Sequence, residues 1–406
     1  KHGQNTPTMA TVGNASLPYD PLSRFLDAKD SPTIRVQGTQ ALAGTNTGSL
    51  KLAENTYGLM IYISNSLGVN CTFCHQTRAM ANWQQSSPQR VTAWHGIRMV
   101  RDLNEQYLDS LDEMLDNTNS KAFIILKDGK IAHEKYFDAF TQDSVWYWAS
   151  AGKSLTGLLV GIAQQEGYLS LQDTSSKFLG PGWTACTPEQ EANIKVWNQV
   201  TMTTGLDDGY GDKDCTLDTC LVYKADPGTR WAYHNAPYTL LDGVIEAATG
   251  QTLNNFHLTR VKQKTGMTGL YVHLDYNNVY FSTARSMARF GLLMLNKGKW
   301  NTTEVLNDTA YYNQAVNTSQ NINQSYGYLW WLNGKSSFHM PSTQIQFPGS
   351  IIPNAPTDMF AALGKNDQKV HVVPSQNLVL IRMGDAAYAN ELVPLTLDDD
   401  IWYWMN

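Results

Sequence analysis

Apolar and polar residues recur with different periods along the chain, and these periods predict its elements. Before residue 50 the sequence is rich in Pro, Asn, Thr, Gly and Ser and has no helical repeat, which indicates extended chain. Apolar residues then follow a helical spacing from Leu52 to Leu67, and Gly68 is expected to end that helix. A second helix is expected over residues 87–108, with Pro88 in its first turn.

The pattern changes after Asn119 towards a mixture of strands and helices. Residues 122–126 and 131–137 flank a Lys-Asp-Gly-Lys turn and predict a β-hairpin, and an apolar helix is expected from Ser150 to Gln165. Further helices and three closing strands are expected at residues 237–249, 284–295, 359–363, 369–373 and 378–383. This succession indicates an α+β domain preceded by a small, mostly helical and loop segment. We place the boundary near residues 109–115, with modules at 1–110 and 111–406.

Composition narrows the classes of function. The chain has 406 residues, a length at which two or three domains are expected, and its hydrophobic content of 42% is ample for packed cores. Its 30 basic residues are scattered and outnumbered, giving a net charge of −6, which argues against a nucleic-acid partner. The longest apolar stretch, residues 155–163, is too short for a transmembrane helix. No signal peptide opens the sequence, so we expect that a leader has been removed or that the chain is part of something longer.

The chain has five cysteines, which fall into two groups. Cys71 and Cys74 belong to the run Cys-Thr-Phe-Cys-His, whereas Cys186, Cys215 and Cys220 form an odd set. The simplest disulfide joins Cys215 to Cys220 and leaves Cys186 free. Pairing of Cys186 with either of the other two remains an alternative at this point.

Ser150-Ala-Gly-Lys153 has Ser-x-x-Lys spacing, which places both side chains on one face of a helix start. A serine hydroxyl is a poor nucleophile until a neighbouring base takes its proton, and a partly neutral lysine can do this. The competing interpretation is that Ser150 merely caps a helix. Downstream, Tyr233-His-Asn235 adds a tyrosine that can share the proton with Lys153 and an amide that can orient the lysine or a substrate carbonyl.

Four runs in this order resemble one family: residues 149–156, 201–206, 233–235 and 281–292. They are similar to serine hydrolases related to class C β-lactamases, a group that includes family VIII esterases, D-aminopeptidases and 6-aminohexanoate-dimer hydrolases. The resemblance covers roughly residues 115–390 and implies a fold like that of β-lactamases and penicillin-binding proteins. That fold has an antiparallel sheet flanked by helices, plus a helical subdomain.

A further motif of this family, Lys-Thr-Gly or His-x-Gly, follows Ser-x-x-Lys and Tyr-x-Asn as the third catalytic motif, and here it departs from the usual pattern. Gly364 fits the family's Lys-Thr-Gly or His-x-Gly motif, but Ala362 stands where a basic residue is usual. The resemblance implies an oxyanion hole formed by the backbone N–H groups of Ser150 and Lys365. Loss of the basic residue argues against β-lactam substrates and favours small esters, linear amides or short peptide-like molecules. The Lys365 side chain either replaces the lost charge or is an ordinary surface lysine.

Cys71-x-x-Cys74-His75 is the attachment signature of c-type haem, in which two thiols bond the vinyl groups and the histidine binds the iron. A zinc site is the alternative, but no second Cys pair lies nearby in the sequence. Met60 is the leading candidate for the sixth ligand, and Met80 and Met99 compete with it.

The first module resembles the part of the photosynthetic reaction-centre cytochrome c subunit that holds its third haem. The most specific matching runs are residues 66–75 and 88–104. The resemblance implies one covalent haem c here, with Met60 and His75 as axial ligands and Arg90 near the haem. It also implies a periplasmic location and a membrane photosystem or another redox protein as partner.

Three functional hypotheses follow from the two modules. The first is a periplasmic serine hydrolase, acting through an acyl-serine intermediate and joined to a monohaem segment. The second is an electron-transfer cytochrome subunit with a passive hydrolase fold. The third is a penicillin-binding or sensor module that is acylated without turnover.

Overall fold

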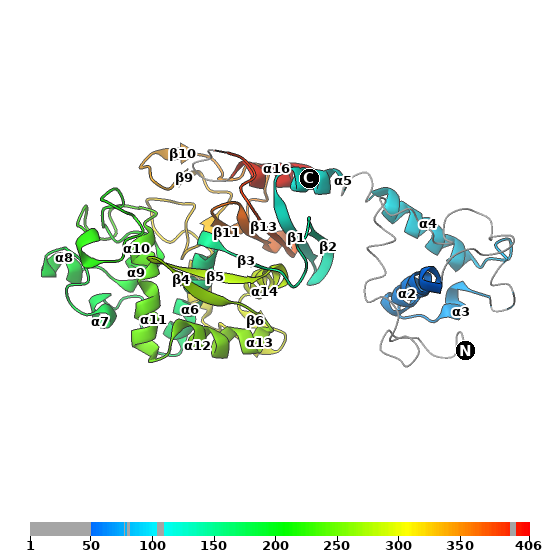
Figure 1. The fold of residues 1–406 in the computed structure, drawn as a ribbon, viewed down its shortest axis with the longest axis horizontal. Coiled ribbons are helices and arrows are strands. Elements are labelled where there is room, and N and C mark those ends of the chain that lie inside the picture. The colour runs from blue at the N-terminus through cyan, green and yellow to red at the C-terminus, as the bar shows by residue number, and fades with distance from the viewer. Residues whose placement is uncertain (1–49, 77, 79–81, 104–108, 390–394) are drawn as a thin grey trace. The chain divides into compact units, whose positions relative to one another are not determined.

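The computed structural model describes residues 50–76, 78, 82–103, 109–389 and 395–406. Two compact units divide the chain between Glu113 and Met114 (Figure 1). The extended segment expected before residue 50 lies outside the described residues, as do Met80 and the last part of the second expected helix.

In the described part of the first unit the chain forms the helices α2 (Leu50–Ser66), α3 (Cys71–Cys74) and α4 (Pro88–Leu103). Helix α2 ends at Ser66, and Gly68 follows it with a left-handed φ of 65°, in agreement with the expected end of this helix. In α2 and α4 the apolar residues Leu59, Ile61 and Trp94 are buried, which makes a small core. Helix α5 (Asp109–Asn117) leads into the second unit.

The second unit is built on a six-stranded antiparallel sheet in the order β2-β1-β13-β12-β11-β8. Its strands are β1 (Ser120–Lys127), β2 (Lys130–Tyr136), β8 (Trp331–Leu332), β11 (Phe360–Gly364), β12 (Gln368–Val373) and β13 (Leu378–Gly384). Every residue of β11, β12 and β13 is buried, so both faces of the central sheet must be covered.

Two helices cover these opposite faces. In α14 (Ala284–Leu295), a Cβ built on Gly291 would lie 2.4 Å from Val379 Cγ1 and 3.2 Å from Val370 Cγ1, so this helix packs directly on the sheet. Lys369 points to the other face because side chains alternate along a strand. There it pairs with Asp398 of α16 (Thr396–Met405). The sheet is therefore the middle layer of this unit.

The other strands form smaller sheets, β3-β5-β4, β6-β7 and β9-β10. Their bounds are β3 (Val145–Tyr147), β4 (Leu270–Leu274), β5 (Asn277–Thr283), β6 (Lys299–Trp300), β7 (Thr303–Glu304), β9 (Ser337–His339) and β10 (Gln346–Pro348). The remaining helices are α6 (Gly152–Gln165), α7 (Ser176–Leu179), α8 (Pro188–Ala192), α9 (Val196–Val200), α10 (Asn235–Thr239), α11 (Leu241–Thr249), α12 (Leu253–His257), α13 (Gln263–Thr265) and α15 (Thr309–Ala315).

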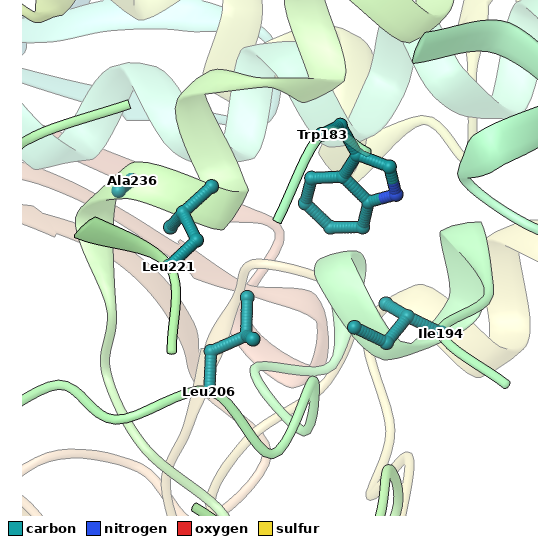
Figure 2. Packing of buried hydrophobic residues seen from close by; sticks show 5 residues of the cluster. All are labelled: Trp183, Ile194, Leu206, Leu221 and Ala236. Carbon is teal, nitrogen blue, oxygen red and sulfur yellow. The ribbon is translucent and has the colours of Figure 1, made fainter. Parts of the chain in front are cut away.

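A second hydrophobic cluster lies among the short helices and loops between α7 and α10 (Figure 2). Its buried members are Trp183, Ile194, Leu206, Leu221 and Ala236. Leu206 closes the Thr-Thr-Gly-Leu run, and Ala236 directly follows Asn235. Burial of these two residues in one cluster anchors the loops that reach the site described below.

The β-hairpin, the helix at 284–295 and the closing strands occur where the residue pattern predicts them. The prediction of one helix over 237–249 is wrong, because the chain forms α10 and α11, which meet at Leu240. The ψ of −10° at Leu240 tightens the backbone there. Ser150, expected to begin the apolar helix, lies instead in a 3-10 turn over Ala149–Ala151 that precedes α6.

Candidate active site

The backbone around Ser150 is an uncommon local structure. Ala149 has a φ of 47°, in the left-handed region that residues with a Cβ rarely adopt, and Ser150 follows in the 3-10 turn. The N-cap of α6 is Ala151, and no side chain caps the helix. The helix-cap interpretation of Ser150 is therefore wrong. Its side chain instead meets two other polar groups.

The first of these groups is the ammonium of Lys153, whose Nζ lies 3.2 Å from Ser150 Oγ. The side chain is only 5% exposed. Burial lowers the pKa of Lys153 to about 7, opposed by the negative charges of Asp214 and Asp242 and assisted by the positive charge of Lys213. A lysine with this pKa is partly neutral near pH 7, so it can accept the serine proton.

The second group is the phenol of Tyr233. It hydrogen-bonds with Ser150, and burial raises the pKa of Tyr233 well above its ordinary value while this hydrogen bond acts in the opposite direction. Lys153 Nζ lies 5.1 Å from the centre of the Tyr233 ring and 4.2 Å from that of Tyr238. The Tyr233 ring stacks on Trp331 of β8 at 5.7 Å. Aromatic faces thus surround the lysine and exclude water from it.

Asn235 starts α10 two residues after Tyr233. His234, between them, is buried with an extended backbone (φ −107°, ψ 116°), so Tyr233 and Asn235 project to the same side. Asn235 Nδ2 donates to Asp214 Oδ1 at 2.6 Å. The predicted role of Asn235 in orienting Lys153 or a substrate carbonyl stays a prediction. Asp214 and the lysine-facing Tyr238 were missed in the sequence, because their spacing matches no motif.

Strand β11 lies directly against the nucleophile turn at Gly364. A Cβ built on Gly364 would be 2.4 Å from Trp148 O and 2.9 Å from Ala151 N, so only glycine fits this close approach. Lys365 follows with an exposed side chain, whereas Ala362 is buried. The strand thus brings the backbone at Lys365 to the same region as that of Ser150, where the resemblance implies the oxyanion hole. The exposure of the Lys365 side chain favours an ordinary surface lysine.

The cysteines outside the first unit settle the disulfide question. Cys215 and Cys220 form a disulfide, and Cys186 is a free thiol. The simplest pairing expected from the sequence is therefore confirmed, and the pairings through Cys186 are wrong.

In the first unit, helix α3 contains the two cysteines of the haem attachment signature. Cys71 and Cys74 are half-buried free thiols, and His75 follows at the helix C-cap. Burial raises the pKa of Tyr57, and the charge of Cys71 acts in the same direction, so Tyr57 of α2 lies near Cys71 of α3. Met60 is half-buried and lies three residues further along α2, on the same face of the helix as Tyr57.

Arg90 lies close to this segment through Ser87, whose hydroxyl donates to Cys74 O at 2.7 Å and accepts from Arg90 N at 3.2 Å. Met99 is 58% exposed, which makes it a poorer candidate ligand than Met60. Within the described residues no cluster of three His, Cys, Asp or Glu side chains could hold zinc. Free thiols, a neighbouring histidine and a methionine on the adjoining helix are the donor set that c-type haem requires, so the residues present fit this group.

The architecture of the second unit recurs in solved structures. A Bacillus anthracis protein whose name assigns it provisionally to the 6-aminohexanoate-dimer hydrolases aligns with a TM-score of 0.56 and 20% identity over 73% of this chain and 80% of its own. A penicillin-binding protein from Bacillus halodurans aligns with a TM-score of 0.52 and 16% identity over 68% of this chain and 96% of its own. Both similarities concern the fold, and they place the second unit in the class of β-lactamase and penicillin-binding-protein folds.

The chain belongs to the beta-lactamase family, whose model matches residues 109–394. The predicted fold class is thereby confirmed. A second model, for the photosynthetic reaction centre cytochrome C subunit, matches residues 1–123. The chain thus joins a beta-lactamase-fold hydrolase domain to a reaction-centre cytochrome c segment.

The first segment is also similar to individual cytochrome subunits. It is 56% identical over 113 residues to the photosynthetic reaction center cytochrome c subunit of Thermochromatium tepidum, an alignment that covers 28% of this chain and 27% of that protein. The chain therefore spans about a quarter of the length of this curated relative. Similarity to this family implies covalently bound haem c. No helix among the described residues is long and apolar enough to span a membrane.

Proposed function

We propose that the second unit is a serine hydrolase that cleaves ester or linear amide bonds through an acyl-serine intermediate. The observation that carries the proposal is the Lys153 ammonium, buried and 3.2 Å from Ser150 Oγ, with a pKa of about 7. A buried charged lysine costs free energy, and here the cost falls when the lysine is neutral and can act as a base.

The proton transfers follow from the two pKa directions. Neutral Lys153 accepts the proton of Ser150 as Oγ attacks the substrate carbonyl, and the carbonyl oxygen becomes negatively charged. The backbone N–H groups of Ser150 and Lys365 stabilise this oxygen. Burial keeps Tyr233 protonated at neutral pH, so it supplies the proton to the leaving group. Water then attacks the acyl-serine, and the same groups act in reverse to release the acid.

The substrate class is inferred from the third motif. Ala362 is buried and apolar at the position where the family resemblance implies a basic residue. A site without that cation has less to bind a substrate carboxylate, which β-lactams carry. We therefore assign small esters, linear amides or short peptide-like molecules as substrates. Attachment of haem to the first unit requires export, so the location is periplasmic.

The first unit is proposed to hold one haem c. Cys71 and Cys74 would bond its vinyl groups, His75 and Met60 would bind the iron, and Arg90 would lie near the haem. When bound, the haem supplies reversible one-electron transfer. The 56% identity to a cytochrome subunit supports a reaction-centre or other redox partner for this segment. A reduced-minus-oxidised spectrum with a c-type α band, lost in the Cys71→Ala/Cys74→Ala variant, tests the assignment.

Steady-state hydrolysis of p-nitrophenyl acetate and an acyl p-nitroanilide tests the hydrolase proposal. Ser150→Ala should abolish turnover, whereas Ser154→Ala, a control at a nearby serine of α6 whose hydroxyl donates to Leu329 O, should retain most of it. Equal activity in Ser150→Ala and the natural chain would contradict the proposal. A single burst of p-nitrophenol with no steady state would instead support the penicillin-binding or sensor alternative.

A further inference from the structure

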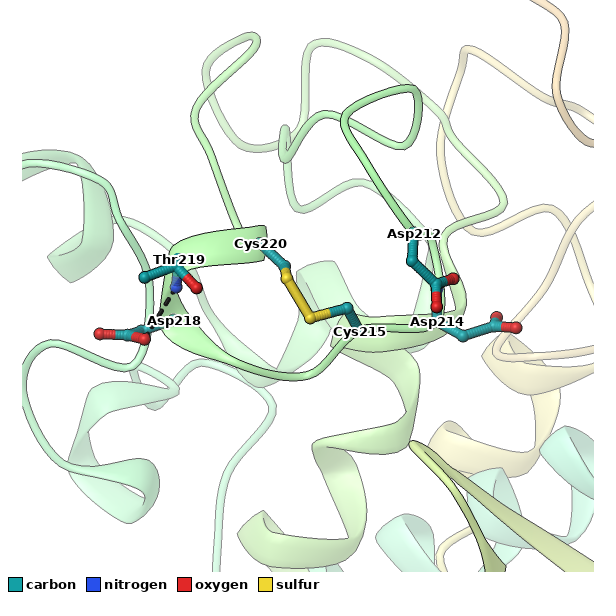
Figure 3. The surroundings of a disulfide bond; sticks show 6 residues. All are labelled: Asp212, Asp214, Cys215, Asp218, Thr219 and Cys220. Atoms are coloured by element: carbon teal, nitrogen blue, oxygen red, sulfur yellow. Dashed lines mark hydrogen bonds between the residues drawn. A yellow bond between two sulfur atoms is a disulfide. The ribbon is translucent and has the colours of Figure 1, made fainter.

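The loop that precedes Tyr233 is closed by a disulfide next to the site. Cys215 is buried and bonded to Cys220, five residues further along (Figure 3). Asp214 immediately precedes Cys215, and its backbone N–H donates a hydrogen bond to Asp212 Oδ1 at 3.0 Å. The loop is tied to α10 as well, because Ala236 N donates to Lys213 O at 3.1 Å. Asp214 is thus held from both sides.

The side chain of Asp214 decides how the carboxamide of Asn235 is turned. Asp214 Oδ1 accepts from Asn235 Nδ2 at 2.6 Å. A carboxylate can only accept hydrogen bonds, so the nitrogen of the amide must face Asp214 and the oxygen must face away. Asn235 Oδ1 is buried and has no hydrogen-bond partner among the described residues. A buried acceptor without a partner costs about 1–3 kcal/mol, which a donor on a ligand would recover.

This acceptor lies in the region of the reaction centre. Asn235 projects to the same side as Tyr233, which hydrogen-bonds with Ser150. The charge of Asp214 also acts on Lys153, where it favours the ammonium form. Asn235 therefore contacts Asp214 directly and lies on the side of the backbone that carries Tyr233.

We propose that Asp214, fixed by the Cys215–Cys220 loop, is a positioning residue that holds Asn235 Oδ1 as a hydrogen-bond acceptor for an N–H group of the substrate. The inference rests on the proposed hydrolase function and deepens it, because it selects substrates with an amide N–H near the reacting carbonyl. An oxygen atom at that place could not donate, and the buried acceptor would stay unpaired.

Two p-nitrophenyl esters with the same leaving group test this selection. One is p-nitrophenyl N-acetylglycinate, and the other is p-nitrophenyl acetoxyacetate, in which oxygen replaces the N–H. The natural chain should prefer the first by about tenfold in kcat/KM, the effect of one hydrogen bond to a buried polar group. Asp214→Asn lets the Asn235 amide turn either way, so the preference should fall to about twofold or less.

The matched control is Asp218→Asn, which removes the same charge from the same loop. Asp218 is exposed and accepts from Thr219 N at 2.8 Å, a bond that asparagine preserves, so this variant should keep the tenfold preference (Figure 3). Asp214→Ser provides a second measurement if Asp214→Asn folds poorly. In both Asp214 variants the acidic limb of the pH profile should also move to lower pH, because removal of the negative charge lowers the pKa of Lys153.

The outcomes distinguish failure of the positioning role of Asp214 from failure of the proposed hydrolase function. Ser150-dependent hydrolysis with an unchanged substrate ratio in both Asp214 variants would overturn the positioning role and leave the hydrolase standing. An equal loss of activity on both esters, with an unmoved pH profile, would also overturn it, since only a structural role does that. Hydrolysis of neither ester in a Ser150-dependent manner would overturn the hydrolase proposal and the inference together.

Discussion

Asp242 of α11 is a buried carboxyl whose replacement by asparagine should stabilise the protein at alkaline pH. Its Oδ2 accepts from Asn278 Nδ2 at 2.7 Å. The other oxygen of each side chain, Asp242 Oδ1 and Asn278 Oδ1, is buried and has no partner in the described part of the chain. A proton on Asp242 Oδ1 would give this pair a donor for the unpaired oxygen of Asn278. The asparagine of Asp242→Asn would supply an N–H there at every pH.

The magnitude follows from the pKa of Asp242, which burial raises from 3.8 to about 7. A carboxyl with a raised pKa in the folded state contributes stability that is fully present below its unfolded pKa and is lost as the pH rises through about 7. Each pH unit between the two pKa values is worth about 1.4 kcal/mol, so the natural chain should lose about 3 kcal/mol relative to the variant between about pH 5 and pH 7.

Urea denaturation of both chains at closely spaced pH values measures this difference. Asp218→Asn, at an exposed carboxyl, is the control and should run parallel to the natural chain. The reasoning would be refuted by a difference between Asp242→Asn and the natural chain that stays constant from about pH 5 to pH 8, since the linkage then would not exist.

Three further predictions concern the base, the glycine and the buried ion pairs. The acidic limb of kcat/KM should lie near the Lys153 pKa of about 7, because only the neutral amine accepts the serine proton; a limb near pH 4 would point to a carboxylate base. Gly364→Ala should slow acylation at least about a hundredfold, because its Cβ would lie 2.4 Å from Trp148 O and displace β11; acylation at the natural rate would show that β11 does not shape the site. Asp398→Asn should cost about 3 kcal/mol in urea denaturation, because it removes a carboxylate that pairs with buried Lys369 and His371; a loss below about 1 kcal/mol would contradict this.

What could be predicted from the sequence is what short-range spacing encodes. The period-two runs gave the hairpin β1-β2, and the Ser-x-x-Lys and Tyr-x-Asn spacings pointed to residues that the structure brings together at Ser150. The short αL backbone at Ala149 and the break between α10 and α11 depend on packing, which leaves no periodic trace.

The polar contacts that support the site and the core could not be predicted from short-range spacing, because their partners are far apart in the sequence. Asp214 lies 21 residues from Asn235, Asp242 lies 36 residues from Asn278, and His371 lies 27 residues from Asp398. These partners meet only after the loops and strands are placed. Their residue types are ordinary ones for turns and helix ends, so no motif separates them from surface residues.

The central claim is that Ser150 is a nucleophile activated by Lys153, and intact mass after treatment with a fluorophosphonate probe tests it most directly. The natural chain should gain the mass of one probe adduct, Lys153→Met should gain it far more slowly, and Ser150→Ala should gain none. An adduct of the same mass, formed at the same rate in Ser150→Ala, would contradict the claim.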